Sequence, residues 1–381
     1  MATDSGADLR IPQDLLPEDG RFGCGPSKVP ATAVDRLAEV APHLLGTSHR
    51  QPPVKQLVAR LRSGLTELFS LPDGYEVALG NGGASLFWDL AALCLIERRS
   101  QHLAFGEFSS KFAQIVQSAP HLAAPEVIEG AAGTCPRPHV NVDVDAYCLT
   151  HNETSTGVQS EVARIGLPGQ LVLVDGTSAA GGLPLDASSF DAYYFSPQKC
   201  FAADGGLWVA LLSPAAIERA ARLKSASRWI PSSLDLSLAL QNSRQDQTYN
   251  TPAVATLFLF VQQLEWILEQ GGLRWATARC RQTASIVYGW ADRAPYATPF
   301  VPNPDQRSQV VATVDLAPEV PAGEVSKVLR RNRIVDIDGY RKLGRNQLRI
   351  GMFPAIEPED AARLTHAIDW VAARIGVANQ I

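Results

Sequence analysis

Between about residues 75 and 212, short apolar segments alternate with stretches that have the periodicity of helices. The apolar segments are residues 75–79, 102–105, 146–149, 171–174, 192–195 and 206–212, and an apolar stretch of helical length, 85–98, separates the first two. This alternation predicts an α/β fold, with a large and mainly parallel sheet covered by helices. The last segment directly follows the turn signal Asp204-Gly205-Gly206, which favours an antiparallel neighbour.

The rest of the chain predicts a smaller α+β domain at the C-terminal end. Helical patterns dominate residues 214–290, with Gly271-Gly272 as the clearest break; after them we expect strands at 309–316, 334–337 and 347–352, a helix at 323–332 and a terminal helix opened by Glu357. With 381 residues, 46% of them hydrophobic, the chain can bury two cores. We expect an N-terminal segment (1–22), a large domain (23–272) and a small domain (273–381).

Composition argues against several classes of protein. The formal net charge of −5 gives no general attraction for nucleic acid or for an anionic membrane. The first ten residues lack the apolar core of a secretory signal, and the most apolar stretch, 253–268, is interrupted by Gln262, Gln263 and Glu265. Six scattered cysteines without a C-x-x-C pair favour reduced thiols, and seven histidines form no metal motif. We therefore expect a cytoplasmic protein without a metal, a nucleic-acid partner or a membrane span.

An acid and a lysine stand at the ends of two neighbouring predicted strands. Asp175 closes the strand at 171–174, and Lys199 follows the strand at 192–195 through Ser196-Pro197-Gln198. In an open α/β sheet, ligands bind at the carboxyl ends of the strands. A partly desolvated lysine can form a Schiff base there, while an acid can pair with a protonated ring nitrogen, and these are the minimal requirements for pyridoxal phosphate. The alternative is an exposed loop lysine and an acid that caps a strand.

Three further features are consistent with this cofactor. Gly80-Asn81-Gly82-Gly83-Ala84-Ser85 joins the first strand to its helix, where glycines and free N–H groups can hold a phosphate. The loop matches neither a full dinucleotide fingerprint nor a P-loop, so it favours a single phosphate, with a plain tight turn as the alternative. Phe108 follows the next strand and could stack on a planar ring, and Thr154 could reach the same place. A core phenylalanine and a turn threonine are equally ordinary interpretations.

Two groups of cationic residues are candidates for binding anionic substrates. Residues 330–349 hold seven arginines and lysines against two acids, a run that usually marks a solvated face. Arg349, however, lies inside the apolar segment Leu348-Arg349-Ile350, where a guanidinium can bind a carboxylate in bidentate fashion. His49-Arg50 lies between two helical patterns and is the second candidate, with a surface loop as the alternative.

Taken together, these residues resemble the phosphoserine aminotransferase family of fold type I, class V pyridoxal-phosphate enzymes. The resemblance runs through nearly the whole chain, and its strongest single motif is Ser196-Pro197-Gln198-Lys199. Its other motifs are Gly23-Cys24-Gly25-Pro26, Ser48-His49-Arg50, the glycine loop, Asn152-Glu153-Thr154, Asp175-Gly176-Thr177-Ser178, Asn250-Thr251-Pro252 and Leu348-Arg349-Ile350.

The resemblance implies roles for several of the matched residues. Lys199 and Asp175 would be catalytic, the lysine holding pyridoxal phosphate covalently and the acid facing its ring nitrogen. The cofactor would also contact Gly83, Ala84, Phe108, Thr154 and Gln198, and Asn250 and Thr251 would reach the phosphate across a homodimer interface. His49, Arg50, Arg341 and Arg349 would bind the substrates. The implied reaction is amino transfer between L-glutamate and 3-phosphohydroxypyruvate, which gives 2-oxoglutarate and O-phospho-L-serine.

Three positions depart from the commoner pattern of this family. Ala84 stands where many members have an arginine that helps to hold the substrate phosphate. Phe108 replaces a stacking tryptophan, and Tyr340 stands near a common histidine, beside Arg341. We expect the basic segment at 330–349 to supply the missing charge.

Other functions remain as alternatives at this stage. Within class V, these are an alanine–glyoxylate aminotransferase or a cysteine desulfurase, for which Cys200 beside Lys199 would be the only close nucleophile. A nicotinamide-dependent dehydrogenase would use the glycine loop, with Glu107 as the acid that binds ribose, but it leaves Lys199 and Asp175 without a role. A non-catalytic regulator of the same fold would need a DNA-binding segment, and none is evident.

Overall fold

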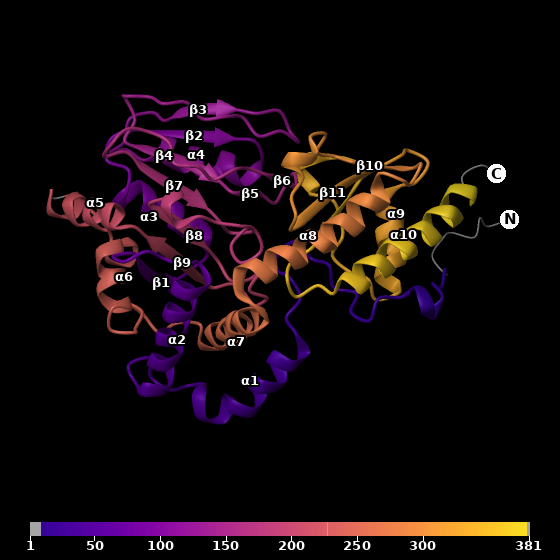
Figure 1. Ribbon diagram of the computed structural model, residues 1–381, viewed down its shortest axis with the longest axis horizontal. Coiled ribbons are helices and arrows are strands. Elements are labelled where there is room, and N and C mark those ends of the chain that lie inside the picture. Colours follow the sequence, from indigo (N-terminus) through magenta and orange to yellow (C-terminus); the bar gives the residue numbers. More distant parts are fainter. Residues whose placement is uncertain (1–8, 227, 379–381) are drawn as a thin grey trace.

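The computed structural model describes residues 9–226 and 228–378, and its main feature is a seven-stranded sheet (Figure 1). The strand order is β1-β9-β8-β7-β4-β2-β3. Strands β2, β3, β4, β7 and β8 are mutually parallel, whereas β9 runs antiparallel to both of its neighbours, β8 and β1. The strand bounds are β1 Glu76–Asn81, β2 Ser100–Ala104, β3 Glu126–Glu129, β4 Ala146–Thr150, β7 Leu171–Asp175, β8 Ala192–Phe195 and β9 Leu207–Leu212.

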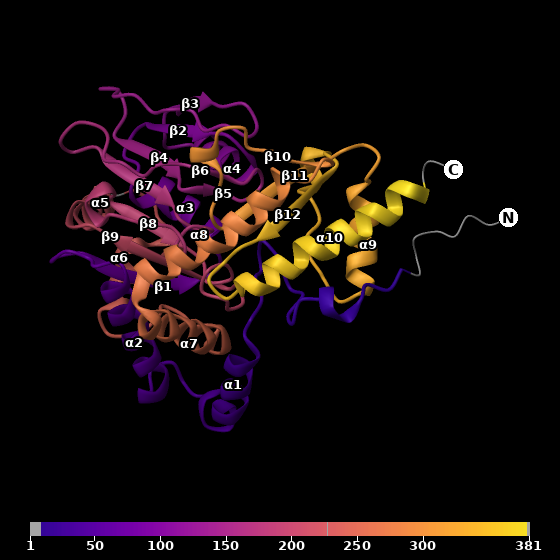
Figure 2. The same cartoon turned by 45° about the vertical axis from the view of Figure 1, so that its right-hand side comes forward.

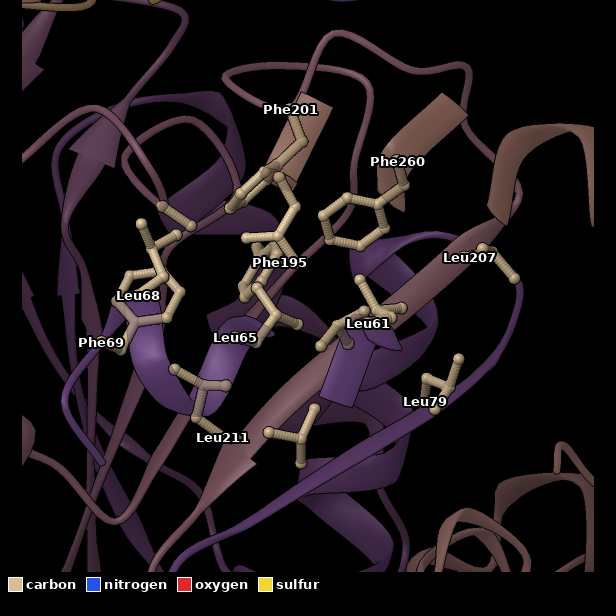
Figure 3. Packing of buried hydrophobic residues seen from close by; sticks show 14 of the residues in the cluster. Leu61, Leu65, Leu68, Phe69, Leu79, Phe195, Phe201, Leu207, Leu211 and Phe260 are labelled. Atoms are coloured by element: carbon tan, nitrogen blue, oxygen red, sulfur yellow. The ribbon is translucent and has the colours of Figure 1, made fainter. Parts of the chain in front are cut away.

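Helices cover both faces of this sheet because its strands are apolar on both sides. In β8, Tyr193 and Phe195 pack under one layer of helices, while Ala192 and Tyr194 pack under the other. The first layer contains α1 (Ala31–Leu44), α2 (Pro52–Leu68) and α7 (Val254–Gln270), and Figure 3 shows Leu61 and Leu65 of α2 beside Phe195. The second contains α3 (Ala84–Cys94), α4 (Glu107–Ser118), α5 (Pro214–Ser225) and α6 (Leu236–Ser243).

The small domain is built on a three-stranded antiparallel sheet, in the order β10-β11-β12 (Figure 2). Its strands are β10 Ala297–Pro299, β11 Val311–Leu316 and β12 Gln347–Gly351, and its helices are α8 Gly272–Ala291, α9 Ala322–Arg331 and α10 Pro358–Ala378. Ile11 and Phe22 of the N-terminal segment are buried in the same core as the helices of this domain. The first described residues therefore pack with the last domain of the chain.

One expectation about a strand is wrong, and one strand was not expected. Residues 334–337 do not form a strand, because Asp336 has a positive φ of 64° that interrupts the extended backbone, and Val335 makes only an isolated bridge with Arg21. The edge strand β3 was not predicted, since its four residues, Glu126–Glu129, are half-buried and exposed in alternation and include two glutamates. None of the described helices is long and apolar enough to cross a membrane.

The two domains meet at a short hairpin, β5 (Asn152–Glu153) and β6 (Val158–Gln159), next to β11. The Oγ1 atom of Thr313 in β11 donates to the carbonyl of Thr156 at 2.8 Å, and the N–H of Ser308 donates to the carbonyl of Gly157 at 3.0 Å. Gly157 has φ +70°, and a side chain there would crowd Thr313, so glycine is required.

The 3₁₀ helices are η2 Gln13–Leu15, η3 Ala187–Ser189, η4 Ser232–Leu234, η5 Pro304–Gln306 and η6 Arg341–Leu343.

Candidate active site

Lys199 is a buried amine at the carboxyl end of the sheet. Its side chain follows β8 and is only 7% exposed. The ammonium nitrogen Nζ donates to the carbonyl of Cys24 at 2.8 Å and to the hydroxyl of Thr154 at 3.4 Å. Burial lowers the pKa of Lys199 to about 8. A neutral, nucleophilic amine is therefore available close to neutral pH.

Residues just after the N-terminal segment hold the lysine loop in place. The Oγ atom of Ser27 donates to the carbonyl of Lys199 at 2.6 Å, and the N–H of Ser27 donates to the carbonyl of Gln198 at 2.8 Å. Gly25 has φ +142°, and a Cβ atom at this position would collide with the Lys199 side chain. The sequence analysis gave Cys24, Gly25 and Ser27 no role in the site.

Asp175 is the buried acid of the site, and two donors hold its carboxylate. Oδ2 accepts from Nε1 of Trp88 in α3 at 3.0 Å, and Oδ1 accepts from the N–H of Thr177 at 2.9 Å. Burial is the largest influence on Asp175 and raises its pKa, while the donors of Thr177 and Trp88 act in the opposite direction. The carboxylate is thus desolvated and fixed in orientation. Trp88 was not among the predicted site residues.

Thr154 connects the lysine with the next layer of polar groups. Its Oγ1 atom donates to Oγ of Ser178 at 2.9 Å, and Ser178 donates to the carbonyl of Asn152 at 3.0 Å. The Asn152 amide donates back to Ser178 at 2.8 Å. This buried network orients the Thr154 hydroxyl, which accepts the hydrogen bond from Lys199.

The carboxylate of Glu153 holds the backbone of Phe108 in place, a contact that the sequence analysis did not predict. Its carboxylate is fully buried and accepts from the backbone N–H groups of Phe108 at 3.1 Å and Ser109 at 2.9 Å, at the start of α4. Ser155 donates to it through N at 3.2 Å and through Oγ at 2.7 Å. The centroid of the Phe108 ring consequently lies 5.9 Å from Nζ of Lys199.

The glycine loop between β1 and α3 leaves space at a helix N-terminus. Gly83 is the N-cap of α3, so no side chain caps the first N–H groups of this helix. A Cβ atom added at Gly83 would have no other atom within 4 Å. Ala84 begins the helix. The first N–H groups of a helix have no partner inside it, so this end can receive an anion.

The segment with Asn250 and Thr251 lies beside this loop. The carbonyl of Thr251 accepts from the amide of Asn81 at 2.8 Å, and its hydroxyl lies 3.1 Å from Nδ1 of His49. Burial, and then the charge of Arg50, lower the pKa of His49. Asn250, Thr251 and Arg50 are exposed. Four predicted residues from two loops therefore gather close to the end of β1.

Arg349 reaches the lysine side of the site from β12. Its NH1 atom donates to the carbonyl of Thr154 at 3.3 Å, and its guanidinium lies 5.2 Å from the centroid of the Tyr340 ring. Its Nε atom is buried without a partner among the described residues. Cys24, Tyr340, Arg341 and Arg349 line one pocket of about 570 Å³.

Three other cations of the basic segment form ion pairs, so Arg341, which lines the pocket beside Arg349, becomes the main candidate to supply the missing charge. Arg345 forms an ion pair with Asp315 at 2.5 Å. Lys342 forms a short ion pair with Glu107. The ion pairs of Arg330, with Asp336 and Asp338, are both 3.1 Å long.

Cys200 does not have the surroundings of a desulfurase nucleophile. The side chain is fully buried, and its Sγ atom donates weakly to the carbonyl of Ser178 at 3.6 Å. It belongs to an apolar cluster with Cys280, and burial raises its pKa well above the usual value. The described residues contain no group of three potential metal ligands.

The arrangement fits pyridoxal phosphate. Lys199 can bind its aldehyde, Asp175 its ring nitrogen, Phe108 its ring face and the start of α3 its phosphate. Two buried oxygen atoms, Oε1 of Gln198 and Oγ1 of Thr177, have no partner among the described residues. Buried polar atoms are normally hydrogen-bonded, so these two are consistent with a ligand that binds here.

The family model described as Aminotransferase class-V matches residues 136–341. Phosphoserine aminotransferases of Rhodococcus opacus and of a Nocardioides species are 55% and 56% identical to this chain, over 96% and 95% of it and 98% of each relative. A solved phosphoserine aminotransferase of Cytophaga hutchinsonii superposes with a TM-score of 0.86 at 25% identity, covering 92% of this chain and 99% of that one. One of Bacillus circulans subsp. alkalophilus gives 0.81 at 21% identity, over 94% of this chain and 99% of that one. The chain therefore belongs to the phosphoserine aminotransferases, pyridoxal-phosphate-dependent enzymes of aminotransferase class V.

Proposed function

We propose that this enzyme transfers the amino group of L-glutamate to 3-phosphohydroxypyruvate, giving O-phospho-L-serine for serine biosynthesis and 2-oxoglutarate. One observation carries the proposal most directly: the buried Lys199 amine lies between Thr154 and the Phe108 ring, one strand away from the buried Asp175. A buried amine with a lowered pKa together with a fixed carboxylate is what transamination on pyridoxal phosphate requires.

Pyridoxal phosphate, when bound, supplies an electron sink for the substrate carbanion. Lys199 is the group that would move the proton, because its pKa of about 8 lets Nζ accept a proton from the substrate Cα and deliver it to the other carbon that is protonated in amino transfer. The Cys24 carbonyl and the Thr154 hydroxyl, which accept hydrogen bonds from Nζ, hold the amine at this edge of the sheet. Asp175 provides the anion that keeps a ring nitrogen protonated, and its burial excludes water from that contact.

Arg349 is placed to bind the α-carboxylate, since it reaches the site through the carbonyl of Thr154. Arg341, His49 and Arg50 then remain for the second anionic group, which is the phosphate or the side-chain carboxylate of glutamate. Each charge-assisted hydrogen bond to a desolvated anion contributes about 1.5–3 kcal/mol, so two of them favour a dianionic substrate by roughly two to four orders of magnitude.

The loss of the yellow cofactor band in a single turnover tests this substrate choice. Phosphoserine and glutamate should each convert the bound cofactor far more efficiently than alanine or serine at equal concentration. Equal efficiency for alanine would refute the named substrates while leaving the family assignment intact.

A homodimer is the second part of the proposal, with Asn250 and Thr251 serving the partner's phosphate site. Its support is that both residues are exposed in a single copy of the chain, so a second copy packed against this surface would contact them. The test mixes two inactive variants, Lys199→Ala and the double variant Asn250→Ala/Thr251→Ala. Mixed dimers contain one intact site only if these residues act across the interface. A mixture that stays inactive although dimers exchange subunits contradicts the proposal.

We further infer a cytoplasmic location. The support is that all six cysteines are free thiols, as expected in a reducing compartment. Fractionation of the native host should recover the enzyme with cytoplasmic markers, and recovery with secreted proteins would contradict this inference.

A further inference from the structure

Trp88 connects the helix that begins at the phosphate loop with the acid of the site. It lies in the second turn of α3, is only 5% exposed, and donates from Nε1 to Oδ2 of Asp175 at 3.0 Å. Its ring also stacks on Phe112 of α4, with centroids 6.1 Å apart and planes inclined by 16°. Two helices therefore fix the orientation of the indole N–H.

We propose that Trp88 is a positioning residue, which orients the Asp175 carboxylate toward the ring nitrogen of pyridoxal phosphate. The inference rests on the proposed function and assigns a role to a residue outside the motifs of the sequence analysis. It depends on the geometry of the carboxylate, since each of its oxygens has one donor: Trp88 for Oδ2 and the N–H of Thr177 for Oδ1.

The charges around Asp175 explain why a donor matters here. Glu153 in β5 and the phenols Tyr193 and Tyr194 in β8 are buried close to it, and Lys199 is the nearby cation. Burial and the charge of Glu153 raise the pKa of Asp175, while the donors of Thr177 and Trp88 lower it. Removing Trp88 shifts this balance toward the protonated acid, which cannot pair with a protonated ring nitrogen.

The variant Trp88→Phe keeps an aromatic ring and removes the N–H. A hydrogen bond to a charged group is worth on the order of tenfold to hundredfold in an equilibrium constant. We expect pyridoxal phosphate to bind the apoenzyme about tenfold or more weakly, and kcat to fall while KM for glutamate changes little. As pH is lowered, cofactor affinity should fall at a higher pH than in the wild type, because Asp175 becomes protonated earlier.

Trp290→Phe is the matched control. Trp290 is 4% exposed and donates to Asp369 at 2.8 Å in the small domain, so it loses the same kind of bond away from the site. Both variants should lower the melting temperature of the apoenzyme, but only Trp88→Phe should change cofactor affinity and its pH profile. Equal cofactor affinity in the two variants would overturn the inference.

A double-mutant cycle with Asp175→Asn shows whether Trp88 acts through Asp175. In the Asp175→Asn background, Trp88→Phe should cause no further loss of cofactor affinity, and a full additional loss would overturn the proposal. If Trp88→Phe does not fold, the indole ¹⁵N–¹H spectrum decides instead: one indole signal of the wild-type apoenzyme should move upfield in Asp175→Asn, and an unchanged set contradicts the bond. Wild-type protein that neither binds pyridoxal phosphate nor transaminates refutes the proposed function itself, which keeps the two failures distinct.

Discussion

Replacing Glu153 by glutamine tests how the enzyme holds Phe108 in the site. One carboxylate oxygen accepts from the N–H and Oγ of Ser155, and the other accepts from the N–H groups of Phe108 and Ser109. The NH₂ group of glutamine must replace one of these oxygens. If the NH₂ group lies on one side it faces the N–H of Ser155, and on the other side it faces the N–H groups of Phe108 and Ser109. These backbone donors have fixed directions, so at least one of them is left buried without an acceptor.

Two contributions set the size of the destabilisation. One buried donor without a partner costs about 1–3 kcal/mol. The lost charge at the N-terminus of α4 adds about 0.3–2 kcal/mol. We therefore expect Glu153→Gln to lower the free energy of unfolding by about 1–5 kcal/mol. Pyridoxal phosphate should also bind more weakly, since the start of α4 carries the Phe108 ring.

Urea unfolding of the apoenzyme and titration with pyridoxal phosphate measure the two effects. The control is Glu265→Gln, which removes a surface ion pair with Arg60 at 2.6 Å and should cost no more than about 1 kcal/mol. If Glu153→Gln is as stable as this control and binds the cofactor normally, Glu153 does not anchor the site and the reasoning fails.

Three further changes probe the lysine and the arginines. Reconstitution of the apoenzyme with pyridoxal phosphate should accelerate as pH rises to about 8 and then level off, since only neutral Lys199 reacts; a rate that still climbs steeply at pH 10 would mean that burial does not lower its pKa. Gly25→Ala should lose most activity and cofactor affinity, because the new Cβ collides with Lys199, and wild-type kinetics would contradict the close approach of Gly25 to the lysine side chain. Arg349→Gln should reduce kcat/KM for both amino donors, phosphoserine and glutamate, by tenfold or more in a turnover assay. Arg345→Gln should have little effect, because that side chain pairs with Asp315. A larger loss of kcat/KM in Arg345→Gln than in Arg349→Gln would refute the placement of the two arginines.

The parts of the site that follow from strand order could be predicted from sequence. Asp175 and Lys199 terminate adjacent parallel strands, so an alternating pattern of apolar segments was enough to bring them to one edge of the sheet. Arg349 could be identified because a lone arginine in an apolar strand needs an anionic or polar partner. These predictions rest on local patterns and on one topological rule.

The supporting residues could not be predicted in this way. Trp88 is 87 positions from Asp175, and Glu153 is 45 positions from Phe108, and no local pattern specifies such pairs. The segments that contain Trp88 and Glu153 have sequences typical of an ordinary buried helix and an ordinary turn. The ion pairs of Lys342 and Arg345 were missed for the same reason, because a basic run looks alike whether its charges are free or paired.

The packing of the N-terminal segment has a consequence for synthesis of the enzyme on the ribosome. The carbonyl of Gly20 accepts from the N–H of Val335, and the carbonyl of Phe22 accepts from the N–H of Gly351, both at 2.8 Å. These partners are synthesised more than three hundred residues later, so the N-terminal segment lacks these hydrogen bonds until translation is nearly complete. Because the adjoining residues Cys24 and Ser27 secure the lysine loop, the nascent large domain can form its sheet without completing its catalytic centre. We therefore expect chains that end before Gly351 to lack contacts that hold the N-terminal segment beside the catalytic centre.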